Sequence, residues 1–282
     1  MSLPQRLLRR LIRAFSLAAI VFLGTVLLTR LAPGYLTDAA ELDPLYGQQA
    51  RLRLQQEADS PLHTVMRFSA AWAHGDLGHS RQYDLPVGLM LVPRIRTTLS
   101  LLGRSIFAGW ILAFCAALPF SPSVRMRRIS GLPFTLLLAV PTGAMATLCL
   151  LVNRGGPVLV LSLLVAARDF KFLSHAIEAA WKSPSRLQAR AQGITSSRIF
   201  RVHMLPAIAH ELRALLTMSI VTSLSAIVPV EVLFDTPGLG QAAWSAAVNR
   251  DLPVLVAVTM GMTLVVILAG MISEVTQEAE LA

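Results

Sequence analysis

The chain has 282 residues, of which 54% are hydrophobic and 15% are charged, and its mean hydropathy is +0.61. Soluble globular domains carry about 25% charged residues, so this composition excludes an ordinary water-soluble protein and indicates a helical membrane protein with several spans. The net charge of +9 does not indicate nucleic-acid binding, because most basic residues flank apolar runs, as they do in membrane proteins.

The first apolar run extends from Ala14 to Leu31 and follows a group of arginines. It is longer than the apolar region of a signal peptide, and Arg30 and Pro33 stand where a cleavage site would have small residues. We therefore expect a first membrane span that is kept. The mixed and polar residues 35–97 predict a folded extracytoplasmic insert.

Further apolar runs predict five more spans. They cover residues 99–120, 132–152, 158–173, 214–234 and 252–271. The fourth has about ten clean apolar residues before Arg168, which is short for a crossing, so a five-span arrangement with a re-entrant 158–173 segment stays open. The sequence predicts an all-α fold with about six transmembrane helices in a single domain over residues 1–282.

Arginine and lysine residues predict the orientation of these spans. They concentrate near the N-terminus, between spans 2 and 3 and in residues 168–213, whereas Arg154 and Arg250 lie in the short loops of the opposite side. Cytoplasmic loops are enriched in such residues. We therefore expect a multi-pass membrane protein with both termini and the region 174–213 in the cytoplasm.

Within that region, residues 186–206 form a polar and basic stretch between apolar spans. Arg186 and Arg190 lie on one face of a predicted helix, and Leu187, Ala191 and Ile194 lie on the other. Two interpretations remain open for this helix. It either presents a face to a soluble partner or lies in the interface and anchors on membrane lipid.

Local signals predict how this helix ends and continues. Gly193 is expected to stop the helix, and Ser196 and Ser197 are expected to cap a second short one. Pro206 is expected near the start of the return to the membrane. The predicted unit is a helix, a turn and a second helix at the cytoplasmic surface.

Glu231 lies near the outer end of predicted span 5, and a charge costs about 2.5–3.5 kcal/mol at a bilayer centre. It either lines a translocation path or is wetted by the loop that follows it, and the adjacent Asp235 favours the second interpretation. Pro237, Gly238 and Gly240 make that loop rich in turn signals. The loop is expected to be an external gate or a plain connector.

Nothing in the sequence indicates catalysis by this chain. Its two lysines, Lys171 and Lys182, lack the glycine-rich loop of a nucleotide-binding site. The histidines show no metal-binding or catalytic spacing. We therefore expect no enzyme activity, no metal and no cofactor in this chain.

Five short motifs follow one another along nearly the whole chain. They are Leu31-Ala32-Pro33-Gly34; Gly75-Asp76-Leu77-Gly78-His79-Ser80; Ala189-Arg190-Ala191-Gln192-Gly193 with Leu205-Pro206 twelve residues after the glycine; Val230-Glu231-Val232-Leu233-Phe234 with Pro237-Gly238-Leu239-Gly240; and Asn249-Arg250-Asp251-Leu252-Pro253. In this order and spacing they resemble motifs of binding-protein-dependent ABC-transporter permeases, in particular of the dipeptide/oligopeptide/nickel permease family.

The resemblance implies that residues 186–206 form a coupling helix that docks in a groove of an ATPase subunit. The implied coupling residues are Arg186, Ala189, Arg190, Ala191, Gln192, Gly193, Leu205 and Pro206. The implied partners are a second permease subunit, two cytoplasmic ATPase subunits and an extracytoplasmic solute-binding protein, with peptides or nickel complexes as cargo. The resemblance also implies a place in the bacterial inner membrane, with any ATP and magnesium held by the partner ATPase subunits. This chain departs from the family pattern at Ser185, Gln192 and His203. An ion-coupled secondary transporter and a non-transporting sensor or scaffold remain as alternatives.

Overall fold

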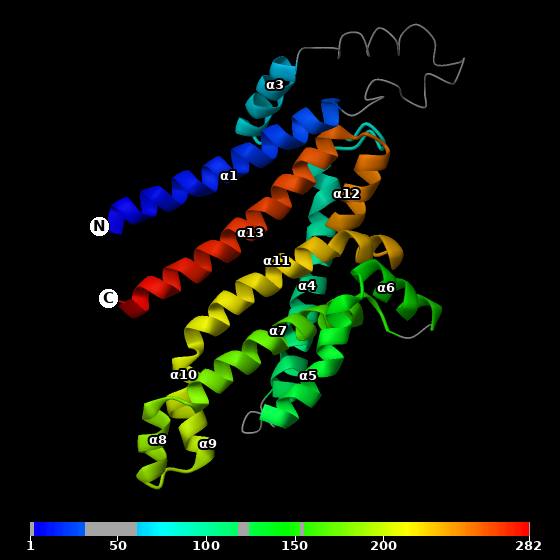
Figure 1. Ribbon diagram of the computed structural model, residues 1–282. Helices are drawn as coiled ribbons and strands as arrows, with labels where there is room; N and C mark the ends of the chain where they lie inside the picture. Colours follow the sequence, from blue (N-terminus) through cyan, green and yellow to red (C-terminus); the bar gives the residue numbers. More distant parts are fainter. Residues whose placement is uncertain (1–2, 32–60, 118–123, 153–154, 282) are drawn as a thin grey trace, which may run out of the picture. The chain divides into compact units, whose positions relative to one another are not determined.

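The computed structural model describes residues 3–31, 61–117, 124–152 and 155–281. Across these ranges the chain is all-helical, and the strand-like pairing found there is an isolated bridge between His79 and Pro86. Figure 1 shows the helices. The chain divides into two compact units. Met1–Ile95 with Ala242–Val265 form the first unit, and Arg96–Gln241 with Val266–Ala282 form the second. The single domain over residues 1–282 stays a prediction.

Two long helices and one short helix form the core of the first unit. It contains α1 (Leu3–Leu31), α3 (Pro61–Ala73), the start of α4 (Val87–Ala117), the end of α12 (Leu239–Val248) and the start of α13 (Leu252–Leu281). Val26, Phe68, Leu252 and Val256 form its buried cluster. These residues come from α1, α3 and α13, so the apolar stripes of three helices meet in one core.

Helix α4 begins before the predicted second span. It starts at Val87, inside the insert predicted for residues 35–97, and runs without interruption through Pro93. Where the insert meets the membrane stays a prediction. Residues 35–60 of the predicted insert lie outside the described residues.

The second unit holds the remaining helices. They are α4 from Arg96 onward, α5 (Val124–Ala139), α6 (Thr142–Leu151), α7 (Pro157–Trp181), α8 (Pro184–Ala191), α9 (Ser196–Ile199), the π-helix η2 (Phe200–Met204), α10 (Leu205–Ala207), α11 (Ala209–Leu233), the first residues of α12 and the end of α13. Helix α7 is the centre of this unit, with twelve buried residues between Val160 and Ala180. It approaches α4 closely at Gly109, where an added Cβ would lie 2.7 Å from a methyl carbon of Val165.

Four helices of the described part are long and apolar enough to cross a membrane. They are Arg9–Leu28, Val87–Ala117, Glu211–Leu233 and Leu252–Met271. The predicted span 132–152 is not one continuous helix, because α5 and α6 meet at an angle of 101°. Pro141 precedes α6 and has an extended ψ of 138°. Counting this bent pair as one span gives five candidate spans.

Helix α7 has the length of a span, with 25 residues, but it is not one of the candidates. Arg168, Asp169 and Lys171 follow one another closely near its middle, and their charges make a lipid-exposed crossing costly. Because α7 is one continuous helix, residues 158–173 do not turn back on themselves as a re-entrant loop would. The six-span arrangement stays a prediction.

Candidate functional site

The polar segment between α7 and α11 folds as a compact cap (Figure 1). Helix α8 ends at Ala191, and Gly193 has a φ of +77°. The amide of Gly193 donates to the carbonyl of Arg190 at 3.0 Å, and the amide of Ile194 donates to the carbonyl of Ala189 at 3.2 Å. This pair of hydrogen bonds is the Schellman arrangement that ends a helix at a glycine. The prediction that Gly193 stops the helix is confirmed.

One side of this cap is anchored by buried apolar residues. Ala189 and Ile199 are each 3% exposed and Met204 is 1% exposed. They pack in one cluster with Leu173 and Ile177 of α7. The cap is therefore held on α7 by an apolar contact and not only by its connections to the neighbouring helices.

The opposite side of the cap is exposed. Arg190, Ala191, Gln192 and Gly193 form a continuous exposed run, and we call these four residues the ledge. Leu205 and Pro206 are also exposed. Of the eight residues implied to contact an ATPase, Ala189 is thus an anchor, whereas the ledge, Leu205 and Pro206 are accessible to a partner. The side chain of Arg186 lies outside the described residues.

One detail of the predicted helices needs correction, and another stays untested. Ala191 was expected on the apolar face, but it is exposed, because the helix ends there and Ala189 takes the buried position. The second helix begins at Ser196, so Thr195 occupies the position before its first residue. The side chains of Ser196 and Ser197 lie outside the described part, and their predicted capping stays a prediction.

The second helix also continues in a way that the sequence did not indicate. Residues Phe200–Met204 form a π-helix between α9 and α10. Such wide turns are rare and occur frequently at functional sites. Pro206 lies in the first turn of α10, directly before α11, which confirms its predicted place at the return of the chain.

A second candidate site surrounds Glu231, which is 0% exposed. The interpretation that the following loop leaves Glu231 in water is therefore wrong. Its Oε2 accepts hydrogen bonds from the amides of Gly240 at 2.7 Å and Gln241 at 3.2 Å, and its Oε1 accepts one from the hydroxyl of Thr98 at 2.7 Å. The hydroxyl of Thr98 in turn accepts from the amide of Leu239 at 2.8 Å.

These bonds make Glu231 a cap of α12. Leu239, Gly240 and Gln241 are the first three residues of that helix, whose free amides and positive dipole end favour a carboxylate. Sequence reasoning missed Thr98, which carries no local signal. The buried carboxyl group of Glu231 thus holds the loop from Asp235 to Gly238 against the end of α11.

Glycines allow this close arrangement. A Cβ on Gly238 would lie 2.1 Å from Oε1 of Glu231, and a Cβ on Gly240 would lie 2.9 Å from the backbone Cα of Val228. Distances under 3.0 Å require the neighbours to move. The two glycines and Glu231 therefore form one packed unit, which we call the α12 cap, and Pro237 beside it is exposed.

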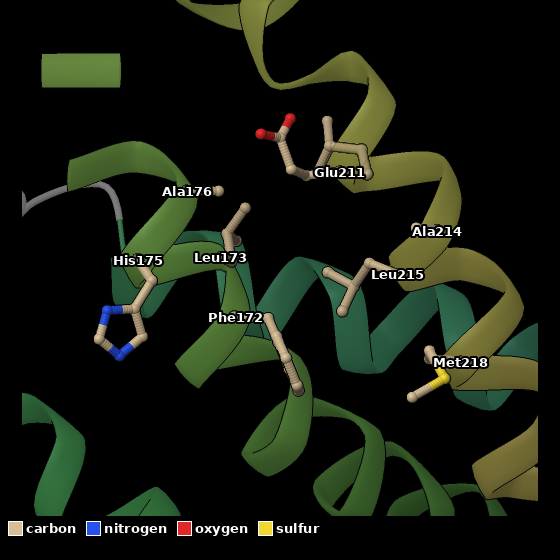
Figure 2. Close-up of a pocket in the computed structure, with 9 residues that line it drawn as sticks. Phe172, Leu173, His175, Ala176, Glu211, Ala214, Leu215 and Met218 are labelled. Carbon is tan, nitrogen blue, oxygen red and sulfur yellow. The ribbon is translucent and has the colours of Figure 1, made fainter. Parts of the chain in front are cut away.

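A pocket of about 360 Å³ lies between α7 and α11. Figure 2 shows Phe172 and Leu173 of α7 opposite Leu215 and Met218 of α11. Its wall is almost entirely apolar. It therefore offers few groups that would recognise a polar solute, and no residue predicted as a functional one lines it.

In a comparison with known protein families, the family described as binding-protein-dependent transport system inner membrane component matches residues 105–279. This range includes the ledge and the α12 cap. A comparison with curated protein sequences found no match.

Proposed function

This chain belongs to the family of inner membrane components of binding-protein-dependent transport systems, and from that premise we propose that it passes peptides or nickel complexes from a binding protein through the membrane. It is a permease subunit of an ABC transporter, a class that works with ATPase and binding-protein partners. In this proposal two ATPase subunits drive the chain and a second permease subunit, and the termini and the ledge face the cytoplasm. No cofactor and no catalytic residue is assigned to the chain itself.

The observation that carries the proposal is the two-sided structure of the segment between α7 and α11. A docking element needs an accessible face and a firm attachment. The ledge provides the first, and the buried residues Ala189, Ile199 and Met204 provide the second. Arg190 in the last turn of α8 also favours an acidic partner surface.

The α12 cap bears on the proposal that the loop before α12 is an external gate. Glu231 holds the loop through three donors, so it is a structural part of the gate and not a residue that contacts cargo. Movement of this loop would require these buried bonds to break together. The proposed gate is therefore the whole turn from Asp235 to Gly240.

The importer proposal is preferred to the ion-coupled transporter because of the family to which the chain belongs. The experiment is co-isolation from membranes that express the chain with its neighbouring genes. A photo-crosslinker at Gln192 should capture an ATPase subunit, and one at Trp244, an exposed residue of α12, should not. Capture of no ATPase from position 192, or uptake by the purified chain alone in vesicles, would refute the proposal.

A further inference from the structure

Two adjacent residues of α7 form side-chain hydrogen bonds with α11. The hydroxyl of Ser219 donates to Oδ2 of Asp169 at 2.6 Å. The guanidinium of Arg168 donates to the hydroxyl of Thr222. Ser219 and Thr222 are three residues apart, so they lie on one face of α11. We call these four residues the polar clasp.

The polar clasp lies inside an apolar contact. Asp169 and Ser219 are each 1% exposed, and Val165, Ala166 and Phe170 beside them on α7 are buried as well. Helix α4 joins the clasp, because Nε1 of Trp110 donates to the hydroxyl of Ser219 at 3.0 Å. Three helices therefore share one buried hydrogen-bond network.

Such a network sets the register between helices. Apolar side chains tolerate small sliding movements, whereas a buried carboxylate that loses its donor pays a desolvation cost. Buried polar groups are best known for fixing register in this way. The polar clasp therefore opposes sliding of α11 along α7 more than the surrounding apolar contacts do.

The same helix also carries the cap. Leu173, Ile177 and Ala180 of α7 lie after the clasp and pack against Ala189, Ile199 and Met204. One continuous helix thus links the ledge to the polar clasp. Force applied to the ledge can reach α7 through this cluster and α11 through η2 and α10, so the two helices move as one body only if they are locked to each other.

We propose that Asp169 is a positioning residue for energy coupling, which locks α11 to α7 so that both helices follow the ledge as one body. This inference rests on the proposed function, in which an ATPase docks on the ledge. Asp169 contacts neither cargo nor nucleotide in this role. It acts through Ser219.

The local chemistry provides matched variants. The hydroxyl of Ser219 also lies 2.8 Å from the carbonyl of Leu215 in its own helix. In Asp169→Ala this carbonyl can accept the hydroxyl proton, so no buried donor is orphaned and the chain is expected to fold. Asp169→Asn keeps a carbonyl acceptor for Ser219, but its NH2 group would occupy the place of Oδ1, which is buried without a hydrogen-bond partner among the described residues, so this variant should restore the lock only in part. Ser225→Ala, at an exposed serine of α11 that bonds within its own helix, is the control.

The test measures a distance in the complete transporter as isolated with its ATPase subunits. Cys115 and Cys149, the native free cysteines, are replaced by alanine, and spin labels are placed at Lys182, directly after α7, and at Ser225 on α11. The helix rise places these positions roughly 30 Å apart. In the wild type the distance should stay the same when ATP and vanadate are added. In Asp169→Ala it should broaden or shift by up to about 5.4 Å, one helical turn.

The second readout is ATP hydrolysis by the same complexes without labels. Asp169→Ala and Ser219→Ala should each lower the binding-protein-stimulated rate about tenfold, within the usual range of coupling energies, and the double variant should be no worse than either. Ser225→Ala should resemble the wild type, and Asp169→Asn should lie between Asp169→Ala and the wild type. A wild-type distance and rate in Asp169→Ala would overturn this inference alone. A wild-type chain that isolates without any ATPase would refute the proposed function, and this inference with it.

Discussion

The hydroxyl of Ser80 donates a 2.5 Å hydrogen bond to Oδ2 of Asp251, although the two residues are 171 positions apart. Asp251 is 1% exposed and Ser80 is 1% exposed. The amide of Gln82 also donates to Oδ2 of Asp251, at 3.3 Å. The bond joins the loop before α4 to the start of α13, so two of the sequence motifs that resemble permeases form a single structural contact.

Removing this hydroxyl should destabilise the first unit. Ser80→Ala leaves the buried carboxylate of Asp251 without its shortest hydrogen bond, and hydrogen bonds to charged groups contribute about 1.5–3 kcal/mol. We expect a lower midpoint of thermal unfolding for the detergent-purified chain. Ser69→Ala removes an exposed hydroxyl that bonds within its own helix, and it should leave the midpoint unchanged. Equal midpoints for the two variants would contradict the assigned role of Ser80.

The α12 cap should not tolerate even one extra methyl group. Gly240→Ala places a Cβ within 3.0 Å of the backbone of Ile227 and Val228, which cannot move as a flexible side chain can. Overpacking of this kind costs about 1–3 kcal/mol. We expect the variant to lose most uptake in whole cells and to expose a cysteine placed at Leu239 to a thiol reagent. Gly103→Ala, where the added Cβ meets nothing within 4 Å, is the matched control, and uptake by Gly240→Ala at the control's level would refute the packing argument.

Two variants of Gly193 separate its backbone role from its surface role. Gly193 has a φ of +77°, and an added Cβ there meets nothing within 4 Å. Asparagine tolerates this conformation best among other residues, so Gly193→Asn should keep the chain turn. Gly193→Asp has nearly the same shape but adds a negative charge to the ledge. We expect Gly193→Asp to abolish ATPase co-isolation while membrane insertion stays normal, and Gly193→Asn to retain most of it. Equal co-isolation by the two variants would show that the ledge is not a docking surface.

Cysteine labelling tests the orientation. A single cysteine at Ser196, in a chain without Cys115 and Cys149, should react with a membrane-impermeant maleimide only in inverted vesicles, because the segment is predicted to be cytoplasmic. A cysteine at Tyr83, which is 47% exposed in the loop before α4, should react only in intact spheroplasts. Labelling of position 196 from outside would reverse the proposed topology.

Much of the helical framework could be inferred from the order of amino acids. Long apolar runs can satisfy their backbone in a membrane only as helices, and this is why the runs at 214–234 and 252–271 match helices of nearly the same extent. The glycine stop at Gly193 was likewise foreseeable, because a left-handed residue favours glycine. The angle of 101° between α5 and α6, next to Pro141, lies inside the predicted span 132–152 and became visible only in the folded chain.

The contacts inside the sites needed the folded chain. Nothing near Thr98 indicates that its hydroxyl bonds Glu231, and nothing near Asp169 indicates that Ser219 is its partner. Helices and turns depend mainly on residues that are close in sequence, so apolar runs and turn residues predict them. Which polar side chains share a hydrogen bond depends on how distant helices pack, because their burial and register are set by the whole core.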